Sequence, residues 1–226
     1  MSAVKIVIIS VIIATVTAAP AAPDKNERSV KPFWHLPCGE VSDNEIIPAE
    51  DTVEELRSVL IRLRLQHELT LNDYLSRDYE FLYERVKKGV HKHQYIPNWI
   101  PGKQDVDNTR GLAGKDPQTI ANHLPKFHLD LQKFAVAIEE LIDDEPSEKI
   151  LTALRSTQSY LQMLLCEVES VIVTLPGINL PGRVSRGIMT AIQREPVDET
   201  RRLIRDWGVL LKYKDYLHAW RHVLDY

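Results

Sequence analysis

The chain has 226 residues, 44% of them hydrophobic and 27% charged, and its formal net charge is −4 at pH 7. Charges of both signs are spread along it, and no basic block indicates binding to nucleic acid or to an anionic membrane surface. The length suits one domain or two small ones, with a fold that depends mainly on a hydrophobic core.

The first residues are typical of a secretory signal peptide. A basic residue, Lys5, precedes an apolar run over residues 6–16, and small residues follow at Ala18 and Ala19. A run of this length is shorter than the ~20 residues that a membrane-spanning helix needs, and the order of basic start, apolar centre and small-residue cleavage site is that of a signal peptide. The alternative is an uncleaved anchor.

The sequence therefore divides into three parts: a signal peptide over 1–18, an N-terminal extended segment over 19–50, and a helical domain over 51–226. We expect the mature protein to be secreted and extracellular, with no membrane insertion. The sequence holds no Asn-x-Ser/Thr sequon, so N-glycosylation is not expected.

The first helical pattern covers residues 52–88. Thr52 and Glu55 have the spacing of a capping box, and Gly89 after Lys87 and Lys88 is a typical stop. Apolar positions recur at helical spacing, and we expect them to form one buried stripe: Val53, Leu56, Leu60, Leu63, Leu71, Tyr74, Leu75, Phe81, Leu82 and Val86.

The second pattern covers residues 117–143, with Asp116 as N-cap and Pro117 in the first turn. Pro125 disturbs it, because proline inside a helix removes a hydrogen bond and clashes with the preceding turn. Two outcomes fit this sequence: a kink at Pro125, or a regular helix that begins near Leu124.

The third and fourth patterns cover residues 147–174 and residues 196–226. Ser147 is the expected cap of the third, and Pro176 with Gly177 ends it. The fourth has its own apolar stripe, formed by Thr200, Leu203, Ile204, Trp207, Leu210, Leu211, Leu217 and Leu224.

The lengths of the links predict the chain direction. Links 1 (89–115) and 3 (175–195) are long, whereas the link over 144–146 is short. A short link makes neighbouring helices antiparallel, while about 20 extended residues at ~3.3 Å each can return along a helix of ~40 Å. The order long, short, long predicts an all-α, up-up-down-down four-helix bundle, the arrangement of growth hormones and cytokines.

The two cysteines are expected to form a disulfide. Cys166 falls on the outward face of the third helix, and Cys38 lies in the Pro-containing segment FWHLPCGE. Two cysteines in an oxidising compartment usually pair, and a Cys38–Cys166 bridge would hold this segment across the outside of the third helix. The alternative is two unpaired thiols.

No catalytic template fits, so we expect neither an enzyme nor a cofactor. His67-Glu68 lacks the second histidine of His-Glu-x-x-His, and the sequence has no Glu-x-x-His, phosphate-binding glycine loop or Gly-x-Ser-x-Gly motif. His218 and His222 lie one helical turn apart, a spacing that could hold a metal. Without a third ligand nearby in sequence we read them as surface residues and expect no metal site.

Three segments carry a resemblance to a known family. The stretch WGVLLK at 207–212, followed by Leu217, Trp220 and Arg221, resembles the last helix of ciliary neurotrophic factor and cardiotrophin-like cytokine factor. The stretch SYLQMLLCEVESVIVTLPGINLPG resembles their third helix, and LTLNDYL the end of their first. The resemblance covers about half the chain and implies the interleukin-6 class of long-chain helical cytokines, or their invertebrate Unpaired-type relatives.

The resemblance implies a ligand that binds cell-surface cytokine receptors and activates JAK/STAT signalling, alone or with a co-secreted subunit. The relatives carry a Phe-x-x-Lys receptor motif at the start of the last helix, where this chain has Arg202 and Arg205, so the aromatic anchor is lost. The first long link offers Trp99 instead, since interface hot spots favour Trp and Arg. The receptor-binding residues predicted are Arg202, Arg205, Trp99, Lys212, Trp220 and Arg221.

Core packing is the alternative for Trp220, and anchoring of its own loop is the alternative for Trp99. A different function also fits the sequence: a secreted helical carrier with a pocket for an apolar small molecule. A third reading is a secreted structural or venom component.

Overall fold

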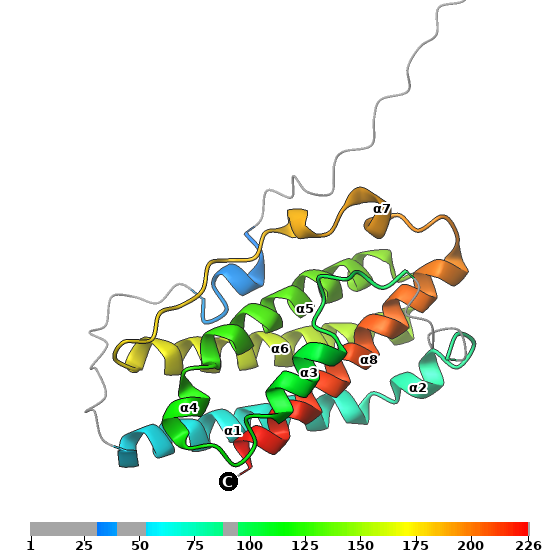
Figure 1. The fold of residues 1–226 in the computed structure, drawn as a ribbon. Coiled ribbons are helices and arrows are strands. Elements are labelled where there is room, and N and C mark those ends of the chain that lie inside the picture. Colours follow the sequence, from blue (N-terminus) through cyan, green and yellow to red (C-terminus); the bar gives the residue numbers. More distant parts are fainter. Residues whose placement is uncertain (1–30, 40–52, 88–94, 226) are drawn as a thin grey trace, which may run out of the picture.

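The structure is a computed structural model that describes residues 31–39, 53–87 and 95–225, and these ranges contain helices, turns and irregular segments but no strand (Figure 1). The prediction of an all-α fold is confirmed for these ranges. The expected signal peptide, Thr52 and Gly89 lie outside the described residues. None of the described helices combines the length and apolar character that crossing a membrane requires.

Four long helices form the body of the molecule: α1 (Val53–Ser76), α5 (Leu124–Asp144), α6 (Glu148–Thr174) and α8 (Glu199–Leu224). In Figure 1, α1 and α5 run from the left of the view to the right, and α6 and α8 run back. Helix α1 packs on α6 and α8, and α5 packs on the same two helices. The contacts therefore form a closed ring in which each neighbour runs in the opposite direction.

The first predicted helix is wrong in one respect, because it breaks in the middle. Helix α1 ends at Ser76, Asp78 has a left-handed φ of 51°, and a short helix α2 (Tyr79–Leu82) follows. Aspartate tolerates the left-handed conformation better than most residues. The break resets the helical register, so Phe81, which was assigned to the buried stripe, is exposed. Leu75, which was assigned to the same stripe, is also exposed, although it lies in α1 before the break.

The first link contains a helix that the sequence analysis missed. Helix α3 (Lys103–Arg110) packs on α8, and α4 (Pro117–Ala121) precedes α5. Asp116 caps α4 as predicted, accepting a hydrogen bond from the Thr119 amide at 3.0 Å. Of the two outcomes at Pro125, the second is confirmed, because α5 starts at Leu124 and Pro125 sits in its first turn, where no amide is needed.

A glycine on α8 lets the first link pack closely against this helix. The side chain of Ile96 occupies the space that a Cβ atom would need at Gly208. Any larger residue at this position would push Ile96 away from α8. Apolar packing is thus one of the contacts that hold link 1.

The remaining boundaries agree with the predictions apart from two details. Ser147 precedes α6, yet its side chain makes no capping hydrogen bond. The last helix begins at Glu199 rather than at residue 196, after Asp198 accepts a hydrogen bond from the Arg201 amide at 2.8 Å. Link 3 contains the short helices η4 (Arg186–Ile188) and α7 (Ala191–Arg194).

The predicted disulfide between Cys38 and Cys166 is confirmed. It fixes the described part of the N-terminal segment, with its short helix η2 (Phe33–His35), to the outside of α6. Trp34 in this segment is fully buried, and its Nε1 donates a hydrogen bond to the carbonyl oxygen of Val184 at 2.8 Å. The segment therefore connects α6 with link 3.

The core is filled with large side chains, many of them aromatic. Trp220 and Phe127 stack with their ring centroids 4.1 Å apart, and Tyr213 lies against Phe134 and Tyr74. The Tyr74 hydroxyl donates a hydrogen bond to the Leu210 carbonyl oxygen at 2.8 Å, which joins α1 to α8.

A buried histidine in this core predicts acid sensitivity. His67 is fully buried beside Phe127, and its ring nitrogens have no hydrogen-bond partner of ordinary geometry among the described residues. Burial, with the charges of Arg221 and His218, lowers its pKa from 6.5 to about 4. In the unfolded chain His67 binds a proton as the pH falls below its ordinary pKa of 6.5, whereas in the folded chain it binds the proton only near pH 4. The free energy of unfolding therefore decreases as the pH falls through this range.

We expect His67→Leu to raise the free energy of unfolding by about 1–2 kcal/mol at pH 7, because it removes buried polar atoms without partners. The wild-type chain should lose about 2–3 kcal/mol more than the variant between pH 7 and pH 4.5. Urea unfolding of both chains at the two pH values measures this difference. Equal losses in the two chains would show that the folded protein protonates His67 freely.

Candidate functional site

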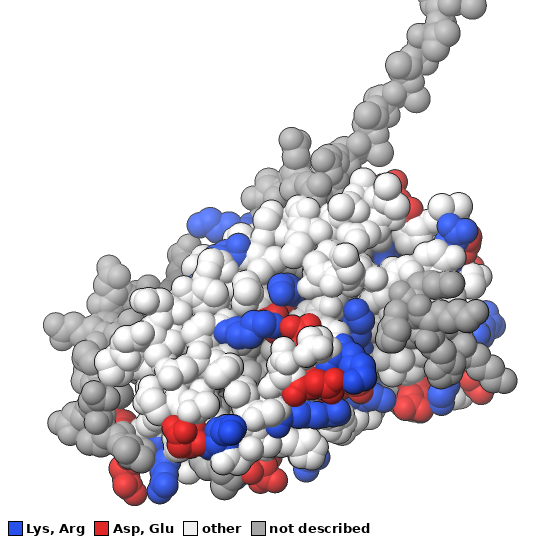
Figure 2. Space-filling view, in the orientation of Figure 1, with Lys and Arg blue, Asp and Glu red and all other residues white. Residues whose placement is uncertain are grey.

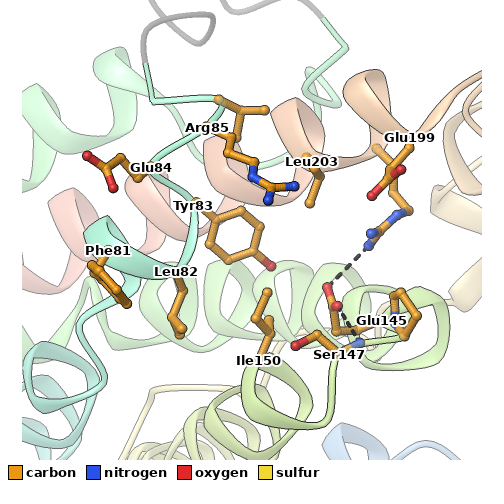
Figure 3. Close-up of a pocket in the computed structure, with 13 residues that line it drawn as sticks. Phe81, Leu82, Tyr83, Glu84, Arg85, Glu145, Ser147, Ile150, Glu199 and Leu203 are labelled. Atoms are coloured by element: carbon orange, nitrogen blue, oxygen red, sulfur yellow. Dashed lines mark hydrogen bonds and ion pairs between the residues drawn. The ribbon is translucent and has the colours of Figure 1, made fainter.

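A hollow of about 370 Å³ lies at the end of the molecule where α2, the α5–α6 link and the first turns of α8 meet (Figure 3). It has an apolar floor and a charged rim. Its lining comprises Phe81, Leu82, Tyr83, Glu84, Arg85, Val86, Glu145, Pro146, Ser147, Ile150, Glu199, Arg202 and Leu203.

The break at Asp78 determines how α2 presents its aromatic residues. Tyr79 and Tyr83 face inward and are buried, and the Tyr83 ring stacks on Trp207 with centroids 5.9 Å apart. Burial raises the pKa of Tyr83 well above its ordinary value, so its hydroxyl stays neutral. The opposite face of α2 carries Phe81, which is turned toward solvent.

Phe81 is the most exposed aromatic side chain in the described residues, at 61%. Lys149 Nζ lies 5.1 Å from the centroid of its ring, a cation–π geometry that holds the ring from one side. Leu82, Ile150 and Leu203 lie partly buried in the floor beside it. The site thus offers one protruding aromatic ring next to an apolar depression.

Arg202 lines this hollow, but its charge is already paired. Its Nη1 lies 3.2 Å from Glu145 Oε2 and 3.2 Å from Asp206 Oδ2, and the Arg202 side chain is 13% exposed. Glu145 also accepts a hydrogen bond from the Ser147 amide at 2.8 Å (Figure 3). The Arg202 side chain therefore orders the rim and leaves only a small surface for a partner.

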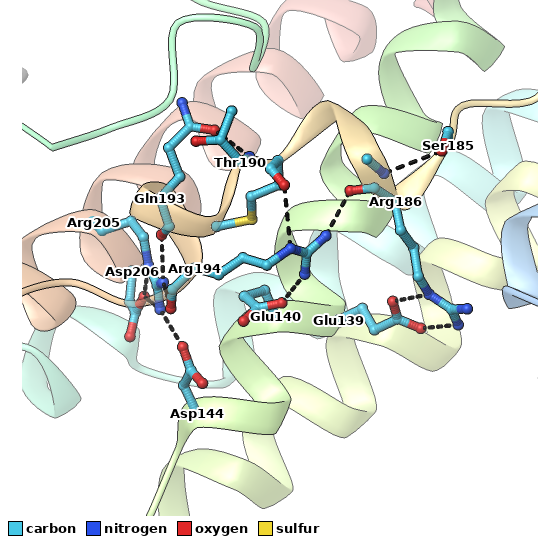
Figure 4. Close-up of polar contacts among 12 residues, drawn as sticks. Glu139, Glu140, Asp144, Ser185, Arg186, Thr190, Gln193, Arg194, Arg205 and Asp206 are labelled. Carbon is cyan, nitrogen blue, oxygen red and sulfur yellow. Dashed lines mark hydrogen bonds and ion pairs between the residues drawn. The ribbon is translucent and has the colours of Figure 1, made fainter. Parts of the chain in front are cut away.

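Arg205, which was predicted to contact a receptor, has a buried side chain. It forms ion pairs with Asp206 at 2.8 Å and with Asp144 at 3.1 Å, and donates hydrogen bonds to the carbonyl oxygens of Gln193 and Arg194 (Figure 4). Arg205 joins α8, α5 and α7 from the inside.

Trp220 is buried as well and stacks on Phe127, as the core-packing alternative expects. Trp99 is partly buried, and its Nε1 donates to Gln193 Oε1 at 3.2 Å, which joins the first link to α7. Lys212 is half-buried near Gly102, and this burial lowers its pKa. Arg221 is exposed. Of the six predicted residues, only Arg202 lines the hollow.

The sequence analysis missed Phe81 because it extended the first apolar stripe through the break. The one signal in the sequence is Asp78, a residue that favours turns and helix caps over helix interiors. That signal is weak, since aspartate also occurs inside helices.

The face of the molecule drawn in Figure 2 has no broad field of one sign. In Figure 2 charged side chains gather over the lower half of the face, where α1, α3 and α8 lie, and both signs are interspersed. His218 is partly buried and His222 is exposed. Within the described ranges, no group of three or more His, Cys, Asp and Glu side chains could hold a metal ion.

Comparison of the chain with protein-family models, with curated proteins and with solved structures found no match.

Proposed function

We propose that the chain is a secreted, non-catalytic ligand that binds receptor ectodomains at the cell surface and activates JAK/STAT-type signalling. The signal-peptide pattern supports secretion. The resemblance of the first, third and last helices to the interleukin-6 class supports the kind of receptor.

We also propose that the domain is an up-up-down-down four-helix bundle with long crossovers at links 1 and 3. The closed ring of contacts among α1, α6, α5 and α8 supports this proposal. So do the helix directions in Figure 1, with α1 and α5 parallel to each other and opposite to α6 and α8. The short helices α2, α3, α4 and α7 lie in the connections.

The exposed Phe81 beside its apolar hollow is the observation that carries the receptor proposal. Large apolar side chains that protrude next to a depression mark interaction sites, and aromatic residues are enriched in the buried centre of interfaces. The start of α8 borders the same hollow, which is where the implied relatives carry their receptor motif. Phe81 thus supplies the aromatic anchor that position 202 lacks.

We expect Phe81→Ala to weaken receptor-dependent STAT phosphorylation by about 30-fold or more in half-maximal dose, the loss typical of an interface hot spot. Purified protein is applied to cells of the source organism, and binding and phosphorylation are measured together. Met163→Ala is the matched control, because Met163 is an apolar side chain, 48% exposed, on the middle of α6. This control should change the dose by less than about twofold.

Two outcomes would contradict the proposal. Equal half-maximal doses for Phe81→Ala and Met163→Ala would show that the hollow is not part of the receptor interface. The absence of binding and signalling in every cell type would remove the ligand function itself. Circular dichroism of both variants tests whether each keeps the helical fold.

The carrier function remains an alternative proposal, and the hollows at the surface give it little support. Four hollows among the described residues are each lined in part by charged side chains, whereas an apolar ligand needs a mainly hydrophobic pocket. Native mass spectrometry separates the two functions, since a carrier would retain a co-purifying apolar molecule and a receptor ligand would not.

A further inference from the structure

A second hollow lies toward the other end of α1 and is basic. It has a volume of about 590 Å³ and is lined by Arg57, Ile61, Arg64, Lys115 and Pro117. The first three residues come from α1, Lys115 comes from the segment that joins α3 to α4, and Pro117 is the first residue of α4. In Figure 1 the start of α1 and α4 lie at the left, far from α2 and the Phe81 hollow.

Within the part of the chain that the structure describes, the positive charges around this hollow have no acidic partner. Among the ion pairs of the described residues, none includes Arg57, Arg64 or Lys115. The nearby Asp116 carboxylate is occupied by Thr119, whose amide and hydroxyl both donate to it. Glu68 stands one turn after Arg64 in α1 without pairing to it.

One donor at this hollow is shielded from water as well as unpaired. Arg64 Nε is buried and has no hydrogen-bond partner among the residues that the structure describes. The terminal nitrogens of Arg64 are not among the buried, unpartnered atoms of the described residues, so they are the donors that an oxyanion in the hollow would contact.

The spacing of the cations suits a linear ligand. Arg57 and Arg64 are seven residues apart on α1, which places them two turns and ~10 Å apart on one face. Between them lies Ile61, an apolar side chain that is 45% exposed. Guanidinium groups bind sulfate, phosphate and carboxylate through paired hydrogen bonds, and Ile61 offers contact to the less polar face of a sugar ring.

We propose that this hollow binds a sulfated polysaccharide chain, with Arg57, Arg64 and Lys115 contacting its sulfate groups. The net charge of −4 repels a polyanion. Binding therefore depends on the local positive charges at this hollow and not on the overall charge of the chain. The proposal is independent of the receptor site, since the two hollows share no residue.

The test is isothermal titration of the full chain with a heparin octasaccharide at 150 mM salt. We expect Arg57→Gln/Arg64→Gln to weaken binding by at least about tenfold, and the slope of log affinity against log salt to fall by about two, one for each lost contact. The control, Arg62→Gln/Arg155→Gln, removes the same charge from two other exposed arginines. It should leave the affinity within about twofold.

Several results would overturn the proposal: no binding by the wild-type chain, equal losses in the two double variants, or equal affinity for a desulfated octasaccharide. If a poly-glutamate peptide binds more tightly than heparin, the ligand of this hollow is an acidic protein segment and not a sulfated polysaccharide. Circular dichroism and thermal unfolding confirm that each variant is folded, so that a loss reports on binding.

Discussion

Replacing Arg205 with methionine is expected to lower the free energy of unfolding by about 3–5 kcal/mol at pH 7. The Arg205 guanidinium is 1% exposed and neutralises Asp206, which is fully buried. Methionine fills a similar volume but donates no hydrogen bond. Its side chain would leave the Asp206 carboxylate with Arg202 alone, and the carbonyl oxygens of Gln193 and Arg194 without this donor.

The pH dependence of this loss identifies its cause. Burial raises the pKa of Asp206 to about 6, and Arg205 opposes that rise. Without Arg205 the pKa of Asp206 should increase further, so the variant keeps a proton on Asp206 at a pH where the wild-type chain has released it. The stability deficit of the variant therefore grows as the pH rises above about 6.

Urea unfolding of both chains at pH 5 and pH 8 measures the deficit, which should be larger at pH 8. The control is Arg201→Met, because Arg201 forms an exposed pair with Asp198 on the same helix. Such surface pairs contribute less than about 1 kcal/mol. A deficit for Arg205→Met that is the same at both pH values would attribute the loss to packing rather than to charge.

Arg205 belongs to a set of arginine contacts that holds link 3 on α5. Arg186 pairs with Glu139 at 2.7 Å, Arg194 pairs with Glu140, and Arg205 pairs with Asp144, so three arginines contact acidic residues of one helix (Figure 4). Link 1 is held differently, by Ile96 over Gly208 and by α3 on α8. Link 1 also has polar contacts, since Trp99 donates to Gln193 and Asp105 of α3 pairs with Lys126, but the described part of this link makes no such set of arginine pairs to α5.

Periodicity predicted the long helices because it reports directly on which face is buried. It did not predict the contacts of link 3, since Glu139, Glu140 and Asp144 look like solvated charges until another segment covers them. The arginines that pair with them are far away in sequence. Burial of a charge depends on tertiary contacts, and a helical pattern contains no information about these.

The candidate site was predicted in part. Arg202 was found through the resemblance of the last helix, and it lines the hollow. Phe81 was not found, because a single left-handed residue, Asp78, turned its side chain from the expected core to the surface. One backbone conformation, invisible to periodicity, therefore decides which aromatic residue is available to a partner.

Removal of the disulfide is expected to destabilise the fold by about as much as Arg205→Met does. Cys38 and Cys166 are separated by 128 residues, and closing a loop of about this length reduces the entropy of the unfolded chain by an amount worth about 4–5 kcal/mol. We expect the free energy of unfolding of Cys38→Ser/Cys166→Ser to fall by roughly this value. Urea unfolding measures it, with reduced wild-type protein as a second sample.

The bridge also has a local role, and Trp34 allows the two effects to be separated. Trp34 is fully buried and donates to the Val184 carbonyl oxygen, while Arg186 lies 5.6 Å from its ring. If the segment stays bound without the bridge, the Trp34 ring remains buried and the loss is that of loop entropy alone. Comparison with Trp34→Phe in the oxidised chain assigns the tryptophan fluorescence. A cysteine-free variant as stable as the oxidised wild type would mean that the bridge does not constrain the unfolded chain.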